Sequence, residues 1–325
     1  MTENVHCTVS RIAGAMLAVV AISAPAQPFP TKPIRFLVGF VPGGSVDILA
    51  RDLAALLTQS LGQQVIIDNR GGAAGLLAAE ATAKAAPDGH TILMAIPNHV
   101  IAPSVYAKVP YEPINDFSAV SLVASSPFML LANLGVAANN LKEFIALAKS
   151  KPGQLNFATP GQGSIQHLSN ELLNHMAGIR MVHVPYKGGV PALIDTIAGA
   201  AAVTLITTVQ GLPQLKAGKV KTFGVTSSKR AAVLPDVPTL AEAGVPGFES
   251  VVWYGVLAPA KTPKPIVAQL NSEITRILKT PQMRDRIAQQ GGEAIAGSPE
   301  ELGKLMREDL KKWSAVAKQA GIKPE

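Results

Sequence analysis

The amino-acid sequence predicts an α/β protein with two α/β sheets and a ligand cleft between them. Short apolar segments that end at glycine-rich turns alternate with amphipathic segments in units of about 30 residues, as in strands joined by crossover helices. The pattern begins near residue 33 and restarts near residue 141, so each half builds its own sheet. Ligands of open α/β sheets bind beyond the carboxyl ends of the strands, which places a cleft between the halves.

In the first half, strands are predicted where apolar runs stop at glycine or proline, and helices where the apolar spacing becomes three or four. Leu49, Leu53 and Leu57 form such a helical stripe, with Ser45 as the predicted N-cap and Gly62 as the stop. The predicted strands are 33–40, 65–67 and 91–96, and the predicted helices are 45–61 and about 74–86.

The second half repeats the strand, turn and helix order without a fixed-period repeat. Its predicted strands are 155–159, 181–186, 203–207, 220–226 and 251–257. Its predicted helices are 141–150, 164–176, 191–198, 265–278, 281–290 and 299–320.

Composition excludes several classes of protein. The chain has 325 residues, of which 48% are hydrophobic and 16% charged, enough apolar material for two packed domains. The formal net charge is +7, but lysines and arginines are scattered, with Lys311 and Lys312 the only adjacent lysines. A nucleic-acid binder gathers these side chains on one stretch or face. We therefore expect no nucleic-acid partner and a surface with a mild bias towards anions.

The N-terminus predicts a secretory signal peptide, residues 1–26, and hence a periplasmic protein. Arg11 precedes the apolar run 12–22, and an A-x-A pattern ends at Ala26, where we expect cleavage. The run is shorter than the roughly 20 apolar residues of a membrane span, although an uncleaved anchor is the alternative. Cys7, the only cysteine, precedes the run, whereas a lipoprotein cysteine would follow it.

Pro42, Gly43, Gly44 and Ser45 form a turn that opens directly onto a helix. The first N–H groups of a helix have no intrahelical partner and carry partial positive charge, so they can hold an anion. Glycine lets a ligand approach the backbone closely. The alternative is a tight turn without a ligand.

A similar turn occurs in the second half at residues 159–164, Thr-Pro-Gly-Gln-Gly-Ser. Gly161 and Gly163 resemble the start of a dinucleotide motif, but Gln166 occupies the place of its third glycine, and no P-loop is present. Nucleotide binding is therefore not predicted. Two anion-binding turns that face each other across the cleft would suit a small carboxylate or dicarboxylate.

Catalysis, a cofactor and a metal are not predicted. The sequence has no G-x-S-x-G elbow, no H-E-x-x-H and no cysteine after residue 26. His167 and His175 lie two turns apart on a predicted helix, too far for a shared metal, and His183 lies on a strand, so we interpret them as structural histidines. Asp47 is interpreted as a partner of the helix dipole rather than as a catalytic acid or an amine ligand.

Other polar side chains follow predicted strands and are candidates for the cleft, although each alone has a structural interpretation. These positions are Asn98, His99, Tyr186, Lys187, Gly188, Thr207 and Thr208. Trp253 and Tyr254 lie on the last strand and either line the cleft or pack in the core.

Several stretches, in the same order and spacing, resemble the Bug-type extracytoplasmic solute receptors, the binding proteins of tripartite tricarboxylate transporters. They span the whole chain after the predicted signal peptide: PTKPIRFLVGFVPGGSVDILAR (30–51), DNRGGAAG (68–75), AAPDGHTILM (85–94), LNFATPGQGSIQHL (155–168), VHVPYKGG (182–189), VTSSKRAAVLPDVPTLAEAGVPGFES (225–250), LAPAKTPKPIV (257–267) and AGIKPE (320–325).

The resemblance implies a two-domain, class II periplasmic-binding-protein fold that closes like a hinge on a small carboxylate, a di- or tricarboxylate or an aromatic acid. We predict domain 1 from residues 27–125 plus 250–325 and domain 2 from residues 126–249. In such receptors two loops of domain 1 hold a carboxylate and domain 2 adds further contacts. Carried over to this chain, the ligand-binding residues are Pro42, Gly43, Gly44, Ser45, Pro97, Asn98, His99, Thr159, Gly161, Gly163, Ser164, Tyr186, Gly188, Thr207 and Thr208.

Two departures from the family pattern bear on the site. The family usually carries Phe-Pro-Ala-Gly-Gly, whereas here proline has moved one place on, to Pro42, where its missing N–H would remove a donor. Ala200, Ala201 and Ala202 stand where many members carry Gln-Val-Asp. The hypothesis that follows is a more apolar site, which favours a larger or less charged acid.

The function predicted from the sequence is a periplasmic solute-binding protein, without catalysis, that captures a small carboxylate. It would act as a monomer and present its ligand to the permease subunits of a tripartite tricarboxylate-type transporter. One alternative is a ligand sensor that uses the same pocket to signal to a two-component system. The other is a secreted hydrolase, for which the sequence shows no triad.

Overall fold

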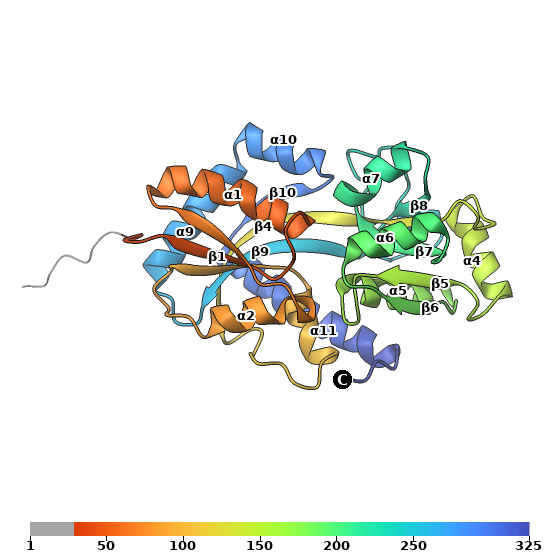
Figure 1. Ribbon diagram of the computed structural model, residues 1–325, viewed down its shortest axis with the longest axis horizontal. Helices are drawn as coiled ribbons and strands as arrows, with labels where there is room; N and C mark the ends of the chain where they lie inside the picture. The colour runs from red at the N-terminus through yellow and green to blue at the C-terminus, as the bar shows by residue number, and fades with distance from the viewer. Residues whose placement is uncertain (1–28, 325) are drawn as a thin grey trace, which may run out of the picture.

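A computed structural model describes residues 29–324, which form two lobes side by side, each built on its own sheet (Figure 1). The predicted signal peptide, residues 1–26, lies outside the described residues. Between residues 29 and 324 we find no helix that combines the length and the apolar character needed to cross a bilayer.

The first lobe is organised around a mixed sheet with the strand order β2-β1-β3-β9-β4. Strand β1 is parallel to both β2 and β3. Strand β9 runs antiparallel to β3 and to β4, and β10 pairs antiparallel with β4. Its strands are β1 (Ile34–Val38), β2 (Val65–Asn69), β3 (Thr91–Ala95), β9 (Val251–Pro259), β10 (Glu293–Gly297) and the first part of β4 (Phe117–Ala132).

The second lobe is organised around the sheet β4-β7-β5-β6, with β8 also paired to β4. Here β5, β6 and β7 are parallel to one another and β7 is antiparallel to β4. Its strands are β5 (Asn156–Thr159), β6 (Val182–Pro185), β7 (Val203–Thr207), β8 (Lys221–Val225) and the last part of β4.

Strand β4 belongs to both sheets and joins the lobes. From Phe117 to Pro127 it pairs with β9, and from Phe128 to Ala132 it pairs with β7. The chain returns to the first lobe at β9, whose first residue, Val251, lies opposite Pro127. The two sheets are therefore continuous through one strand.

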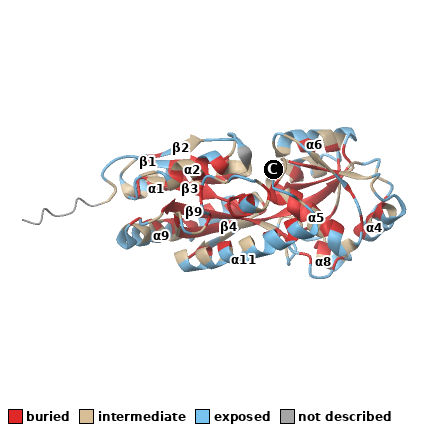
Figure 2. Ribbon diagram, turned by 90° about the horizontal axis from the view of Figure 1, so that it is seen from below, coloured by how far each residue is buried: buried red, intermediate tan, exposed pale blue. Residues whose placement is uncertain are grey.

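Helices cover the faces of both sheets, so that the central strands are buried and the outer helix faces are exposed (Figure 2). Strands β6 and β10 are largely exposed or half-buried. Helix α11 packs on β4 in the first lobe and also on α5 in the second. The helices are α1 (Ser45–Leu61), η1 (Ala73–Gly75), α2 (Leu76–Ala83), α3 (Asn98–Ile101), η2 (Ala102–Ser104), α4 (Leu141–Ser150), α5 (Ile165–Ala177), α6 (Gly189–Ala198), α7 (Thr208–Lys216), α8 (Leu240–Ala243), α9 (Lys264–Leu278), α10 (Pro281–Gln289) and α11 (Pro299–Gln319).

One apolar core runs through both lobes. Its largest cluster of buried residues contains Phe36 and Leu53 from the first lobe and Phe144 and Phe223 from the second. The predicted stripe on α1 is buried as expected, and the helix ends at Gly62 in the left-handed conformation (φ 66°).

The predicted α/β class and most predicted elements are confirmed. The helix predicted over about 74–86 is shorter, because Ala74 (φ 54°) and Gly75 (φ 102°) adopt left-handed conformations and the α-helix starts only at Leu76. Strands β4 and β10 and helices α3, α7 and α8 were not predicted from the sequence.

Candidate functional site

The start of α1 offers main-chain N–H groups that no side chain caps. The N-cap is Gly44, not Ser45 as predicted, and Ser45 is the first helical residue. Ile48 N donates to the carbonyl of Gly44, but among the described residues we find no acceptor for the amides of Gly44 and Ser45. Since such amides carry the positive end of the helix dipole, this turn is available to an anion.

A charged network holds this turn in place. Asp47, which is 2% exposed, accepts a hydrogen bond from Gly43 N (2.9 Å), from Arg51 Nε (2.9 Å) and from Asn69 Nδ2 (2.8 Å). Asn69 Nδ2 also donates to the carbonyl of Phe40. Burial raises the pKa of Asp47, but the hydrogen bonds from Arg51, Gly43 and Asn69 outweigh burial and hold it below its ordinary value. Asp47 is therefore an ionised brace of the turn.

The same network shows which main-chain donors remain in the turn when proline stands at position 42. Pro42 has no N–H, but the donor next along the chain, on Gly43, is already bound to Asp47 inside the protein. The donors that remain for a ligand are those of Gly44 and Ser45.

Ser45 faces the junction of the lobes. Its side chain is hydrogen-bonded to Tyr254 on β9, and burial raises the pKa of Tyr254 to about 12 although this hydrogen bond acts in the opposite direction. A cavity of about 20 Å³ lies here, bordered by α1, β4, β9, the start of α7 and the α10–β10 turn. Its polar lining is Ser45, Ser125, Ser126, Tyr254 and Gln290.

Residues 97–99, after β3, make contacts in different parts of the protein. Asn98 Oδ1 accepts from Ile165 N (3.2 Å), at the start of α5 in the other lobe. His99 instead turns into the core, where it stacks on Tyr111 with 4.9 Å between ring centroids and Nε2 lies 2.9 Å from the carbonyl of Pro113. The carbonyl of Pro97 accepts from Val100 N. His99 is thus committed to the core, whereas Asn98 reaches the other lobe, and the ligand contacts predicted for this loop stay a prediction.

In the second lobe, the polar groups of the turn over residues 159–164 are hydrogen-bonded largely within the turn and to the start of α5. Ser164 caps α5 by accepting from His167 N (3.2 Å), and its hydroxyl donates to the carbonyl of Gly161 (2.8 Å). The Thr159 hydroxyl accepts from Gly161 N (3.2 Å). Because Asn98 takes the amide of Ile165, the start of α5 is not the open anion site that the sequence predicted.

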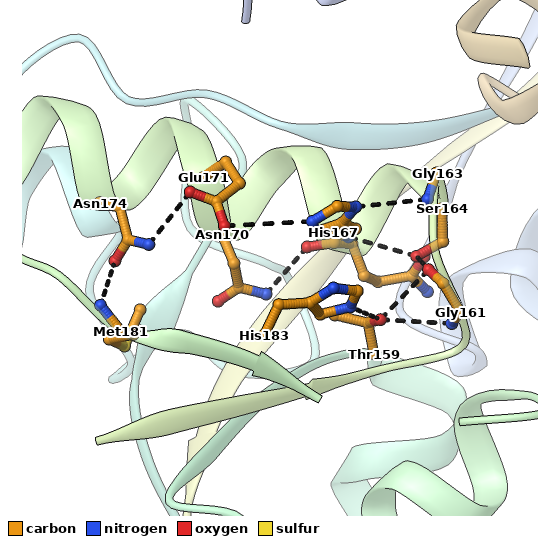
Figure 3. A network of polar contacts seen from close by, with 11 residues as sticks. Thr159, Gly161, Gly163, Ser164, His167, Asn170, Glu171, Asn174, Met181 and His183 are labelled. Atoms are coloured by element: carbon orange, nitrogen blue, oxygen red, sulfur yellow. Dashed lines mark hydrogen bonds and ion pairs between the residues drawn. The ribbon is translucent and has the colours of Figure 1, made fainter. Parts of the chain in front are cut away.

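Two histidines lie beneath this turn, and the sequence did not predict that they meet. The rings of His167 on α5 and His183 on β6 stack with centroids 3.8 Å apart (Figure 3). Gly163 N donates to His167 Nδ1 (3.2 Å), and Thr159 Oγ1 lies 2.6 Å from His183 Nε2. His175 is exposed at the far end of α5, away from this pair.

The starts of α6 and α7 are the uncapped helix ends of the second lobe. Their N-caps, Gly188 and Thr207, make no side-chain capping bond. Gly188 N donates to the carbonyl of Pro160, so the turns after β5 and β6 touch. Tyr186 is hydrogen-bonded to Asp195 through its side chain. Together, these turns form the edge of the second lobe that faces the first.

Contacts across the junction show that the lobes are closed on each other. The Thr208 hydroxyl donates to the carbonyl of Gln290 (2.8 Å). A Cβ on Gly163 would lie 2.4 Å from Val105 Cγ2, so the turn of one lobe rests directly on the other. The enclosed cavity is the size of a water molecule rather than of a carboxylic acid.

The three alanines that depart from the family pattern do not border the junction cavity. Ala200, Ala201 and Ala202 precede β7, and Asn156 Oδ1 accepts from Ala202 N (2.7 Å). Thr207 ends the same strand at the junction, about 16 Å away along an extended chain. The hypothesis that these alanines make the site more apolar is therefore wrong.

The chemistry of the junction is that of anion binding without charged side chains. None of the described residues that border the cavity is ionisable as a base or an acid, apart from the Tyr254 phenol. Within residues 29–324, no group of three or more His, Cys, Asp or Glu side chains could hold a metal. Uncapped helix starts, hydroxyls and a carboxamide remain, and these are donors suited to a carboxylate.

A site of this kind at the junction of two α/β lobes is typical of a binding protein of the periplasmic type. The chain belongs to the tripartite tricarboxylate transporter family receptors, whose family model matches residues 49–322. As the resemblance implied, it is a substrate-binding receptor and not an enzyme.

Solved structures support this assignment. The R. palustris protein Rpa4515 with adipate is 35% identical, covers 91% of this chain and 100% of its own, and has a TM-score of 0.86. The periplasmic binding protein BugD is 34% identical with a TM-score of 0.83, over 91% of this chain and 100% of its own. MatC from Rhodopseudomonas palustris with bound malate is 36% identical with a TM-score of 0.81, over 89% and 100%. The predicted two-domain periplasmic-binding-protein fold is confirmed.

Proposed function

We propose that this protein is an exported, monomeric receptor that binds a small dicarboxylate between its lobes and delivers it to the membrane permease subunits of a tripartite tricarboxylate transporter. The division into residues 27–125 plus 250–325 and residues 126–249 gives the two bodies that move. Export would follow from the signal peptide predicted at residues 1–26.

The observation that carries the proposal is the meeting of two helix starts at one cavity. Ser45 at the start of α1 and Val209 in the first turn of α7 border the same space, together with the hydroxyl groups of Ser126 and Tyr254. Neither helix start is capped by a side chain. A carboxylate placed between them would receive N–H groups from both lobes, which links binding to closure.

The ligand class follows from the same chemistry. Helix dipoles and neutral donors stabilise an anion without a fixed guanidinium, so the ligand can carry a carboxylate at each end without a matched arginine. Adipate and malate, the acids bound by two solved relatives, are both dicarboxylates. We therefore propose a linear dicarboxylate of four to six carbons as the ligand.

The test is isothermal titration of the purified, processed protein with malate, succinate, glutarate and adipate, after unfolding and refolding to remove any acid carried from expression. We expect one of these acids to bind and to raise the melting temperature, because a ligand at 100 times its Kd adds about 2.7 kcal/mol of stability. A protein that binds none of them, and binds no tricarboxylate or aromatic acid either, would contradict the proposal.

The matched variants are Tyr254→Phe and Tyr111→Phe. Both remove one buried phenolic hydroxyl, but Tyr254 borders the cavity and Tyr111 packs in the His99 cluster. We expect the first to weaken binding about tenfold, the effect of one lost hydrogen bond to a charged group, and the second to leave it within about twofold. Equal effects would mean that the cavity is not the binding site.

A further inference from the structure

The stacked pair of His167 and His183 lies directly under the 159–164 turn, which rests on the first lobe at Val105. Their rings are 3.8 Å apart and within 12° of parallel (Figure 3). The ring of Phe157 on β5 stacks on His183 at 5.1 Å. His167 is 4% exposed and is buried with the core of the second lobe. His167 is therefore enclosed, and His183, which is only partly buried on β6, is packed against His167 and Phe157.

Each ring holds one end of the turn. Gly163 N donates to His167 Nδ1, so this nitrogen has to be unprotonated for the bond to exist. His183 Nε2 lies 2.6 Å from the Thr159 hydroxyl, which in turn accepts from Gly161 N. A proton on His167 Nδ1 removes the acceptor of Gly163, and a proton on both rings places two positive charges against each other.

We propose that His167 and His183 are positioning residues of the 159–164 turn, and that protonation of His167 loosens this turn, weakens the closure of the lobes and releases the ligand. The part that concerns the ligand rests on the proposed function. The part that concerns the turn does not, because it depends only on the contacts of this protein.

The surroundings of the pair favour the neutral rings. Burial lowers the pKa of His167 to about 4. Burial, with the neighbouring His167 as a second cause, lowers the pKa of His183 to about 3. The closed protein therefore takes up protons less readily than a form in which the rings are exposed, and acid favours that second form.

Other charged groups near the pair do not offset this preference. Glu171, one turn along α5, lies 4.0 Å from His167 Nε2, but burial raises the pKa of this carboxyl group. Strands β5 and β7, against which α5 packs, carry only uncharged residues, and His183 is the only ionisable residue in β6. On α11, which also packs on α5, Asp309 accepts from Trp253 Nε1 and Lys312 donates to the carbonyl of Glu249.

The first experiment measures the affinity for adipate and malate between about pH 7.5 and about pH 5, the range in which a free histidine titrates. We expect the affinity of the wild type to fall about tenfold or more as the pH is lowered. The double variant His167→Asn/His183→Gln puts carboxamide atoms near Nδ1 and Nε2 that do not titrate, so its affinity should fall only as far as protonation of the acid itself requires. His175→Gln, on the exposed end of the same helix, should behave like the wild type.

The second experiment uses the ligand-free protein and needs no knowledge of the ligand. We expect the imidazole resonances of His167 and His183 to titrate well below the ordinary histidine pKa of about 6.5, and the amide resonance of Gly163 to move with His167. If His167 titrates at the ordinary value and the Gly163 amide does not respond, the proposal is overturned even when an acid binds.

The two experiments separate the proposals. Failure of every acid to bind would contradict the proposed function, and the resonances would still decide the role of the histidines. Binding that does not change with pH in the wild type would overturn acid-driven release.

Discussion

The two glycine-rich turns that open onto α1 and α5 have similar sequences but are held in opposite ways. The turn before α1 is fixed by an ionised carboxylate, Asp47, with Arg51 and Asn69 as its donors. The turn before α5 is fixed by neutral groups, among them the rings of His167 and His183. An ionised carboxylate keeps its contribution to stability through mild acid, whereas a buried neutral imidazole begins to lose its contribution once the pH falls below the ordinary histidine pKa.

The turns also differ in what they leave free. Gly44 caps α1 only through its backbone, so the first amides of that helix stay open to a ligand. Ser164 and Asn98 occupy the first amides of α5. Similar motifs therefore serve different purposes: one offers donors to the ligand, and the other fixes the position of the lobe around it.

The largest expected effect comes from breaking the brace of the first turn with Asp47→Ala. The substitution leaves Gly43 N, Arg51 and Asn69 without their acceptor, and we expect a loss of about 3 kcal/mol in the free energy of unfolding together with loss of binding. Urea unfolding and titration calorimetry measure the two effects. Asp285→Ala, on the exposed face of α10, is the control and should cost less than about 0.5 kcal/mol. Two equally small changes would show that the network is dispensable.

The next effect tests the contact between the second turn and the first lobe. Gly163 has φ 70°, and a Cβ there would lie 2.4 Å from Val105 Cγ2. Gly163→Ala should therefore cost about 2–3 kcal/mol and hold the lobes apart, which small-angle scattering detects as a larger radius of gyration. Gly153→Ala shares the left-handed backbone (φ 74°) with nothing within 4 Å of the added Cβ. It should cost only about 1 kcal/mol, with no change in shape. If both variants have the same cost and shape, the contact does not limit closure.

Acid should affect the stabilising groups of the two turns, His167 and Asp47, differently. The pKa of His167 is lowered from an ordinary 6.5 to about 4, so its contribution to stability is present above about pH 6.5 and is lost as the pH falls towards 4. Between about pH 7 and about pH 5 this loss is roughly 2 kcal/mol for His167 alone. Asp47, whose pKa is lowered from 3.8, keeps its contribution over that range and loses it only at lower pH. Denaturant unfolding at several pH values measures both.

His99, buried in the first lobe with a pKa lowered to about 4 by burial, adds a similar acid sensitivity. The informative comparison is therefore between the wild type and His167→Asn/His183→Gln. The double variant should keep only the part of the pH dependence that His99 contributes. An unchanged pH dependence would assign the acid sensitivity to the first lobe instead.

The smallest effect concerns the hydrogen bond that Ile165 N in the second lobe donates to Asn98 Oδ1 in the first. Asn98→Ala leaves Ile165 N without its acceptor, which should cost about 1 kcal/mol and weaken ligand binding about fivefold. Asn139→Ala, at an exposed position before α4, is the control and should change neither quantity. A ligand that binds more tightly to Asn98→Ala would mean that Asn98 competes with the ligand for the start of α5.

How well the sequence predicted each element depended on whether its signal was local. Helix α1 carried a leucine stripe and a terminal glycine, and α4 has exactly the predicted bounds, with Asn140 as a side-chain cap. Strand β4 was missed because its 16 residues include four serines and Pro127, which interrupt an apolar run. Its burial comes from pairing with β9, more than 100 positions away in the chain, and no local pattern records that.

Helix α7 was missed for a related reason. It contains Gly211 and Pro213, which both disfavour helix in isolation. Gly211 is required by packing, because a Cβ there would lie 2.8 Å from Ile206 Cγ2. At the site, the glycine-rich turn onto α1 was predicted, but its cap was assigned to Ser45 and not to Gly44. The commitment of His99 to the core and the stacking of His167 on His183 depend on tertiary neighbours.

The single strand that joins the lobes has a mechanical consequence. Strand β4 changes partners between Pro127 and Phe128, and Pro127 has no N–H to contribute to either ladder. The opening that we propose must therefore be absorbed as twist over a few peptide units, with hydrogen-bonded sheet on both sides. We expect such a joint to be stiff: it limits how far the lobes can open and keeps their relative orientation fixed. The lobes would then close along the same path each time.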